Sequence, residues 1–174
     1  MSARFWFAPL WTFSLRTLLL VIGVAAVPLG LGVNHLHRER LRRMLAQPII
    51  DAAEIGDAES IRQLLDRGAD VNSIANGRFP WTPLMHAAFR GHPDAVRLLL
   101  DRGANLDHEC LDGFTALTLA AGEEHWEIVR LLADRGGDVG HRDATGKSAF
   151  SLAERADQSE LLEAFRLGRA TAKP

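Results

Sequence analysis

The clearest copy of a motif that recurs along the chain reads Trp81-Thr82-Pro83-Leu84-Met85-His86-Ala87-Ala88-Phe89-Arg90-Gly91-His92. It is followed by the mostly apolar segment Val96-Arg97-Leu98-Leu99-Leu100 and then by Gly103-Ala104-Asn105-Leu106-Asp107. This last segment has counterparts 35 residues earlier, at Gly68, and 33 residues later, at Gly136. Thr82-Pro83-Leu84 likewise recurs as Thr115-Ala116-Leu117 and as Ser148-Ala149-Phe150. Because separate marks keep one register, we interpret the chain as a tandem array.

Each unit of the array reads as two helices joined by a turn and followed by a loop. Paired alanines let the first helix pack closely on a neighbour, and the second helix has apolar residues at helical spacing. Thr82 and Thr115 suit helix N-caps, while Gly103 and Gly136 suit left-handed helix ends. The pattern predicts helix pairs over 48–67, 82–102, 115–135 and 148–167. The last pair has a polar second helix, as expected of a terminal unit with one face in water.

This motif resembles the ankyrin repeat. The resemblance implies an all-α solenoid of about four helix-turn-helix pairs, which usually binds other proteins and performs no chemistry. The chain departs from the family pattern Thr-Pro-Leu-His, because the histidine position holds Met85, Thr118 and Ser151. We therefore expect any hydrogen-bond network built on that histidine to be altered in all three units.

An uncharged apolar segment, residues 17–33, precedes the repeats. As a helix it would span roughly 25 Å, and extension back to Trp11 would match a hydrocarbon core of about 30 Å. We expect a transmembrane helix here. Four arginines in residues 34–47 outweigh Arg4 and Arg16 on the other flank, so the repeats should face the cytoplasm. The alternatives are a signal peptide cleaved near Ala26 and a buried soluble helix.

The expected organisation has five parts: an interfacial segment (1–16), the membrane helix (17–33), a basic juxtamembrane linker (34–47), the repeat domain (48–167) and a tail (168–174). Residues 1–47 contain six arginines and one glutamate, a net charge of +5, which leaves −7 for the remainder. An acidic repeat domain is a poor nucleic-acid binder. The basic half suits anionic lipid headgroups instead.

No residue pattern indicates catalysis, a cofactor or a metal site. Cys110 lies near His108, but neighbouring loop residues do not make an oriented base, so we expect a surface thiol. A single cysteine also excludes an internal disulfide. His92 and His125 hold matching repeat positions, which favours a structural role. We therefore predict that the chain is not an enzyme.

The resemblance places a partner-binding surface on the hairpin tips and the exposed side of the first helices. Aromatic side chains beside arginine are typical binding anchors. The alternative is that some of these aromatics pack between repeats. The residues carried over by position are Arg78, Phe79, Trp81, Phe89, Arg90, Leu111, Asp112, Phe114 and Glu123.

The sequence as a whole predicts a membrane-anchored, cytoplasm-facing module that binds an unidentified protein and does not bind nucleic acid. One alternative is an exported module of the same kind. Another is a non-catalytic partner subunit of an enzyme, and a third is self-association through apolar hairpin tips.

Overall fold

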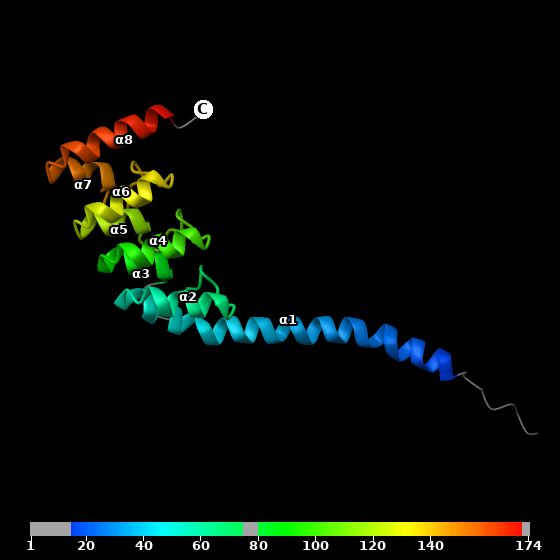
Figure 1. Ribbon diagram of the computed structural model, residues 1–174. Helices are drawn as coiled ribbons and strands as arrows, with labels where there is room; N and C mark the ends of the chain where they lie inside the picture. The colour runs from blue at the N-terminus through cyan, green and yellow to red at the C-terminus, as the bar shows by residue number, and fades with distance from the viewer. Residues whose placement is uncertain (1–14, 75–79, 172–174) are drawn as a thin grey trace, which may run out of the picture. The chain divides into compact units, whose positions relative to one another are not determined.

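A computed structural model describes the backbone of residues 15–74 and 80–171 and the side chains of residues 35–74 and 80–167, and all of its regular structure there is α-helical (Figure 1). The chain divides into two compact units, Met1–Glu39 and Arg40–Pro174. Helix α1 (Leu15–Ile55) contributes residues to both units. The second unit contains the repeats, and the description below concerns that unit.

Four helix pairs make up the repeat unit, as the sequence predicts. The end of α1 forms the first pair with α2 (Ala58–Asp66). The other three pairs are α3 (Pro83–Arg90) with α4 (Pro93–Asp101), α5 (Ala116–Gly122) with α6 (Trp126–Asp134), and α7 (Ala149–Arg155) with α8 (Ser159–Thr171). Helices α3, α5 and α7 stack on one another, and α2, α4, α6 and α8 form a second stack (Figure 1).

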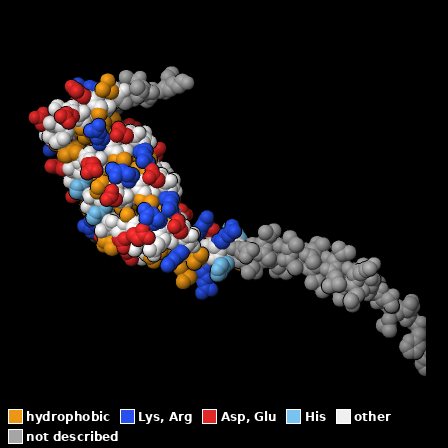
Figure 2. Space-filling view, viewed as in Figure 1, with side chains coloured by type: hydrophobic (Ala, Val, Ile, Leu, Met, Phe, Trp, Pro, Cys, Tyr) orange, Lys and Arg blue, Asp and Glu red, His pale blue; other side chains and the backbone are white. Residues whose placement is uncertain are grey.

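The core runs continuously between the two stacks. The paired alanines of the first helices, such as Ala87 and Ala88, are fully buried because their small side chains let adjacent helices approach. Val96, Leu99 and Leu132 of the second helices are also fully buried. Side chains of both charge signs are interspersed over the face of the repeats that Figure 2 shows. No single helix pair could bury its apolar face, so stacking supplies the stability.

Polar residues at the family's histidine position close the first turns of α5 and α7. Thr118 donates and accepts hydrogen bonds with the N-cap residue Thr115, and Ser151 does the same with Ser148. Such reciprocal pairs satisfy two otherwise free backbone N–H groups. Met85 cannot take this role, and only its backbone N–H reaches the Thr82 hydroxyl, at 3.4 Å. At the position where the family has histidine, Thr118 and Ser151 therefore form local helix caps.

The helix ends are tied from one repeat to the next. Arg102 and Arg135, which end α4 and α6, form ion pairs of 2.9 and 3.0 Å with Asp66 and Asp101 of the preceding repeats. These pairs are partly exposed, so each contributes at most about 1 kcal/mol. Their regular recurrence keeps successive second helices in register.

The predicted membrane segment, residues 17–33, lies within α1, and its side chains fall outside the described residues. Within the described part of the chain, no helix is long and apolar enough to cross a membrane. The predicted linker, residues 34–47, is helical as part of α1. Of the predicted interfacial segment (1–16), residues 1–14 lie outside the described residues and the last two begin α1. The membrane anchor therefore stays a prediction.

Candidate protein-binding surface

An aromatic cluster lies at the exposed side of α3. Trp81 immediately precedes the N-cap of α3, and Phe89 sits in the last turn of the helix, with ring centroids 5.1 Å apart. The Trp81 ring also meets His86 edge-on at 5.3 Å. All three side chains are half-buried and keep one edge in solvent. Two turns of helix thus present one apolar patch.

Arg90 borders this patch and links it to the first repeat. Its guanidinium group lies 5.7 Å from the centre of the Phe89 ring and forms an ion pair with Glu54 of α1. The hydrogen bond from Arg90 lowers the pKa of Glu54, although partial burial works in the opposite direction. Glu54 is therefore ionised at neutral pH, and the pair fixes the arginine beside the aromatic rings.

His86 adds a buried polar atom to the patch. Its Nε2 is shielded from solvent and has no hydrogen-bond partner among the described residues. Burial lowers the pKa of this imidazole, with Arg90 acting in the same direction and Glu54 and Asp51 opposing. Sequence reasoning missed His86 and Glu54. The repeat register offered a signal, because Glu54 and Phe89 are 35 residues apart and thus occupy equivalent positions.

A second group of predicted residues lies in the hairpin between α4 and α5. Leu111 is 88% exposed at the tip, whereas Phe114 is half-buried against the core. The hairpin is held closed by two backbone hydrogen bonds, in which the Cys110 N–H donates to the Phe114 carbonyl and the Gly113 N–H donates to the Cys110 carbonyl. The Asp112 carbonyl accepts from the backbone N–H of Ala144 of the next hairpin at 3.0 Å. The hairpin tip is therefore ordered by hydrogen bonds and exposes the side chain of Leu111 to solvent.

The structure thus brings Trp81, Phe89 and Arg90 together and groups Leu111, Asp112 and Phe114 in one hairpin. Glu123 is exposed at the C-terminal cap of α5 and, by the 33-residue offset, holds the position equivalent to Arg90. Arg78 and Phe79 lie outside the described residues.

The expectation of a surface thiol is wrong. Cys110 is only 8% exposed and belongs to the core cluster, because the closed hairpin turns its side chain inward. Burial removes it from reaction with external substrates. Across the described residues, no group of three or more His, Cys, Asp and Glu side chains is arranged to hold a metal ion.

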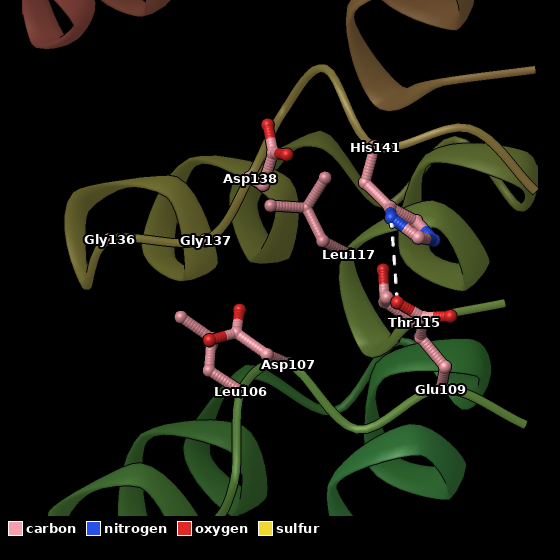
Figure 3. A pocket seen from close by; sticks show the side chains of 9 residues that line it. All are labelled: Leu106, Asp107, Glu109, Thr115, Leu117, Gly136, Gly137, Asp138 and His141. Carbon is pink, nitrogen blue, oxygen red and sulfur yellow. Dashed lines mark ion pairs between the residues drawn. The ribbon is translucent and has the colours of Figure 1, made fainter. Parts of the chain in front are cut away.

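A polar hollow of about 350 Å³ lies between the α4–α5 hairpin and the α6–α7 hairpin (Figure 3). His141 ties its two sides together: Nε2 lies 2.9 Å from the Gly113 carbonyl, and Nδ1 lies 3.7 Å from Glu109 (Figure 3). Asp107 and Asp138 line the remaining wall. Both ring nitrogens of His141 therefore already have partners, and the arrangement is that of a tie between hairpins.

His92 and His125 have the structural role that their matching positions predict. The Nε2 atoms of His92 and His125 lie 3.0 and 3.1 Å from the carbonyl oxygens of Glu54 and Phe89, respectively. Each imidazole thereby satisfies a carbonyl at the end of the preceding repeat's first helix.

Comparison with known proteins agrees with this architecture. The sequence model described as "Ankyrin repeats (3 copies)" matches residues 49–164, which is more than half of the chain. No curated protein matches the chain. The stacked helix pairs, the capped first helices and this match lead to one conclusion: the chain belongs to the ankyrin repeat family.

Proposed function

We propose that this protein is a membrane-anchored docking module that captures a protein partner on the α3 patch and the Leu111 hairpin tip. Ankyrin repeats are protein-interaction modules and are generally non-catalytic. The observation that supports a binding role for α3 is the contact between Trp81 and Phe89 on its exposed side.

The patch has the physical properties of a binding anchor. Trp81 and Phe89 restrain each other, and Arg90 is restrained by Glu54, so these three side chains would lose little conformational entropy when a partner docks. Aromatic residues and arginine dominate measured interface energies. Leu111 adds apolar area on a hairpin that is already ordered. A rigid surface of this kind binds by shape complementarity.

The anchor is proposed from residues 17–33, which are apolar and uncharged. Arg38, Arg40 and Arg43 follow them as exposed side chains of α1 and favour a cytoplasmic position for the repeats. Confinement to a membrane would raise the effective concentration of the module for a membrane-bound partner. The alternative remains an exported module released by cleavage near Ala26.

Partner capture tests the binding surface. The full chain is incorporated into native membranes, cross-linked and purified as three forms: wild type, Trp81→Ala/Phe89→Ala, and Leu111→Asp. Because Trp81 also packs on the core, thermal unfolding followed by circular dichroism checks that the double variant stays folded. Arg130→Ala, exposed on α6, serves as the control. A protein captured by wild type and control and lost from both patch variants supports the proposal; equal capture by all forms contradicts it.

Alkaline extraction tests the anchor separately. An integral membrane protein stays in the membrane pellet at high pH, and deletion of residues 17–33 should move the chain to the supernatant. Release of the intact chain would contradict the anchor. A mature N-terminus at or after Ala26 would favour the exported alternative.

A further inference from the structure

The first-helix face changes its chemistry from one repeat to the next. Trp81 and Phe89 occupy two positions that, 33 residues on, hold Phe114 and Gly122. Another 33 residues on, the same positions hold Lys147 and Arg155. The aromatic pair of the second repeat is thus replaced by a pair of cations in the fourth.

A hollow of about 310 Å³ lies where this change occurs. Gly122, at the end of α5, leaves it open, because a Cβ at this residue would meet no atom within 4 Å. Trp126 and Leu152 provide apolar walls, and both Lys147 and Arg155 line the rim. The hollow is therefore formed by the end of α5, the start of α6 and the length of α7.

The rim carries a local excess of positive charge. Lys147 and Arg155 are exposed, and neither forms an ion pair with any described residue, while Glu124 is the one carboxylate on the lining. The backbone N–H of Lys147 donates to Asp143, and the charge of its ammonium group acts on the same carboxylate from beyond ion-pair distance. This excess contrasts with the net charge of −7 on residues 48–174. Two cations that form no ion pair with the described residues thus face one hollow.

We infer that this hollow takes an acidic side chain of the partner protein, as part of an extended segment that also lays an apolar residue on the Trp81–Phe89 patch. The inference rests on the proposed function and deepens it. A glutamate fits because its methylene groups contact Trp126 and Leu152 while its carboxylate meets the two cations. The net negative charge of the repeats disfavours the same carboxylate elsewhere, which favours this direction for the segment.

The spacing of the two contacts follows from the stack. Helices α3, α5 and α7 lie side by side (Figure 1), and packed helices are about 8–10 Å apart, so the two contacts are separated by roughly 16–20 Å. An extended chain covers about 3.3 Å per residue. The partner segment should therefore place its apolar and acidic residues about five or six positions apart.

A random twelve-residue peptide library displayed on phage, selected against the full chain in detergent micelles, tests this inference. Selected peptides are synthesised, together with copies in which each Glu or Asp is replaced by Gln or Asn, and their Kd values are measured. Two variants challenge the hollow: Lys147→Ala/Arg155→Ala removes the cations, and Gly122→Leu fills the space. Arg67→Ala/Arg130→Ala removes two exposed charges outside the hollow as the matched control.

We expect acidic peptides that bind at least tenfold more weakly to both hollow variants, and as tightly to the control as to wild type. The amide copies should lose a similar factor on the wild-type chain only. Peptides without acidic residues, or equal binding to the hollow variants, would overturn the inference. If such peptides still lose affinity for Trp81→Ala, the proposed docking surface stands and only the acidic contact fails; if they do not, both fail.

Discussion

The imidazole of His125 packs directly on the backbone of Gly91 in the preceding repeat. A Cβ at Gly91 would lie 2.5 Å from Cε1 of the ring, closer than any two such atoms can approach. His125 also contacts the Phe89 carbonyl through Nε2 at 3.1 Å. His125 can reach the Phe89 carbonyl only because Gly91, on whose backbone the ring packs, has no side chain.

The packing of a histidine on a glycine of the preceding repeat also occurs one repeat earlier, but it is absent from the fourth repeat. Gly56 would place a Cβ 2.6 Å from the ring of His92. In the fourth repeat, Gln158 stands where the histidine would be, and the residue opposite is Glu124, which adopts a positive φ of 61°. The glycine is therefore present where a histidine packs on it and absent where none does.

Replacing Gly91 by alanine should destabilise the fold more than the same change at Gly103. Both glycines have positive φ, which costs a non-glycine residue about 1–2 kcal/mol, but only Gly91 faces a ring. Overpacking against His125 should add about 1–3 kcal/mol. Thermal and urea unfolding of the full chain in detergent measure both variants.

A double variant isolates the cause of that difference. In Gly91→Ala/His125→Ala the clash is gone, so the loss should be smaller than the sum of the two single losses. Equal destabilisation by Gly91→Ala and Gly103→Ala would show that the His125 ring can move aside without cost, and would contradict the predicted overpacking.

Replacing Thr118 by valine should cost about 1–3 kcal/mol in the free energy of unfolding. Valine keeps the shape but leaves the buried backbone N–H of Thr115 without the Thr118 hydroxyl that now accepts from it at 2.9 Å. Ser151→Ala at the equivalent, more exposed position should cost less. Chemical denaturation compares the two; an equal or reversed order would mean that burial does not set the strength of these caps.

Much of the fold could be predicted from periodicity alone. The helix pairs follow from Ala87-Ala88, Thr82 and the recurring glycines, because these residues have local conformational preferences that act within one unit. The capping by Thr118 and Ser151 was harder to foresee. Their polarity indicated only that the family network is altered, whereas the reciprocal hydrogen bonds depend on side-chain rotamers.

The candidate surface was predicted less completely, because its contacts cross between repeats. Trp81, Phe89 and Arg90 were identified from their positions, yet the partner of Arg90 is Glu54, 36 residues away. The burial of Cys110 depends on how its hairpin closes, and a polar neighbourhood of Asp107, His108 and Glu109 suggested the opposite. Sequence spacing shows which residues are equivalent and does not show which ones touch.

The buried Cys110 thiol should react slowly with a maleimide or disulfide reagent in the folded full chain. Its 8% exposure requires local opening of the hairpin before reaction. Addition of denaturant should raise the rate by at least a hundredfold, and Phe114→Ala, which removes packing over the hairpin, should raise it in native conditions. Rapid native labelling of the wild-type chain would contradict the closed hairpin.

His86 should make the repeat unit less stable as the pH falls below about 6.5, the ordinary pKa of histidine. Burial lowers its pKa in the folded state, so between the folded and unfolded pKa values the unfolded chain binds more protons, and stability rises with pH. His86→Leu, which installs the residue found at the equivalent positions 119 and 152, should flatten this dependence.

Urea midpoints measured between pH 7.5 and 5.0 make the comparison for His86. This range stays above the titration of Glu54 and Asp143. The Arg90 hydrogen bond lowers the pKa of Glu54. Burial acts to raise the pKa of Asp143, but hydrogen bonds from Thr145 and Lys147 and the Lys147 charge together lower it. Their stabilising contributions are lost only at lower pH. The leucine variant should also be the more stable form, because it removes the unpartnered Nε2. Parallel pH profiles for wild type and variant would mean that His86 can protonate without cost, and that the patch opens to solvent more readily than its packing implies.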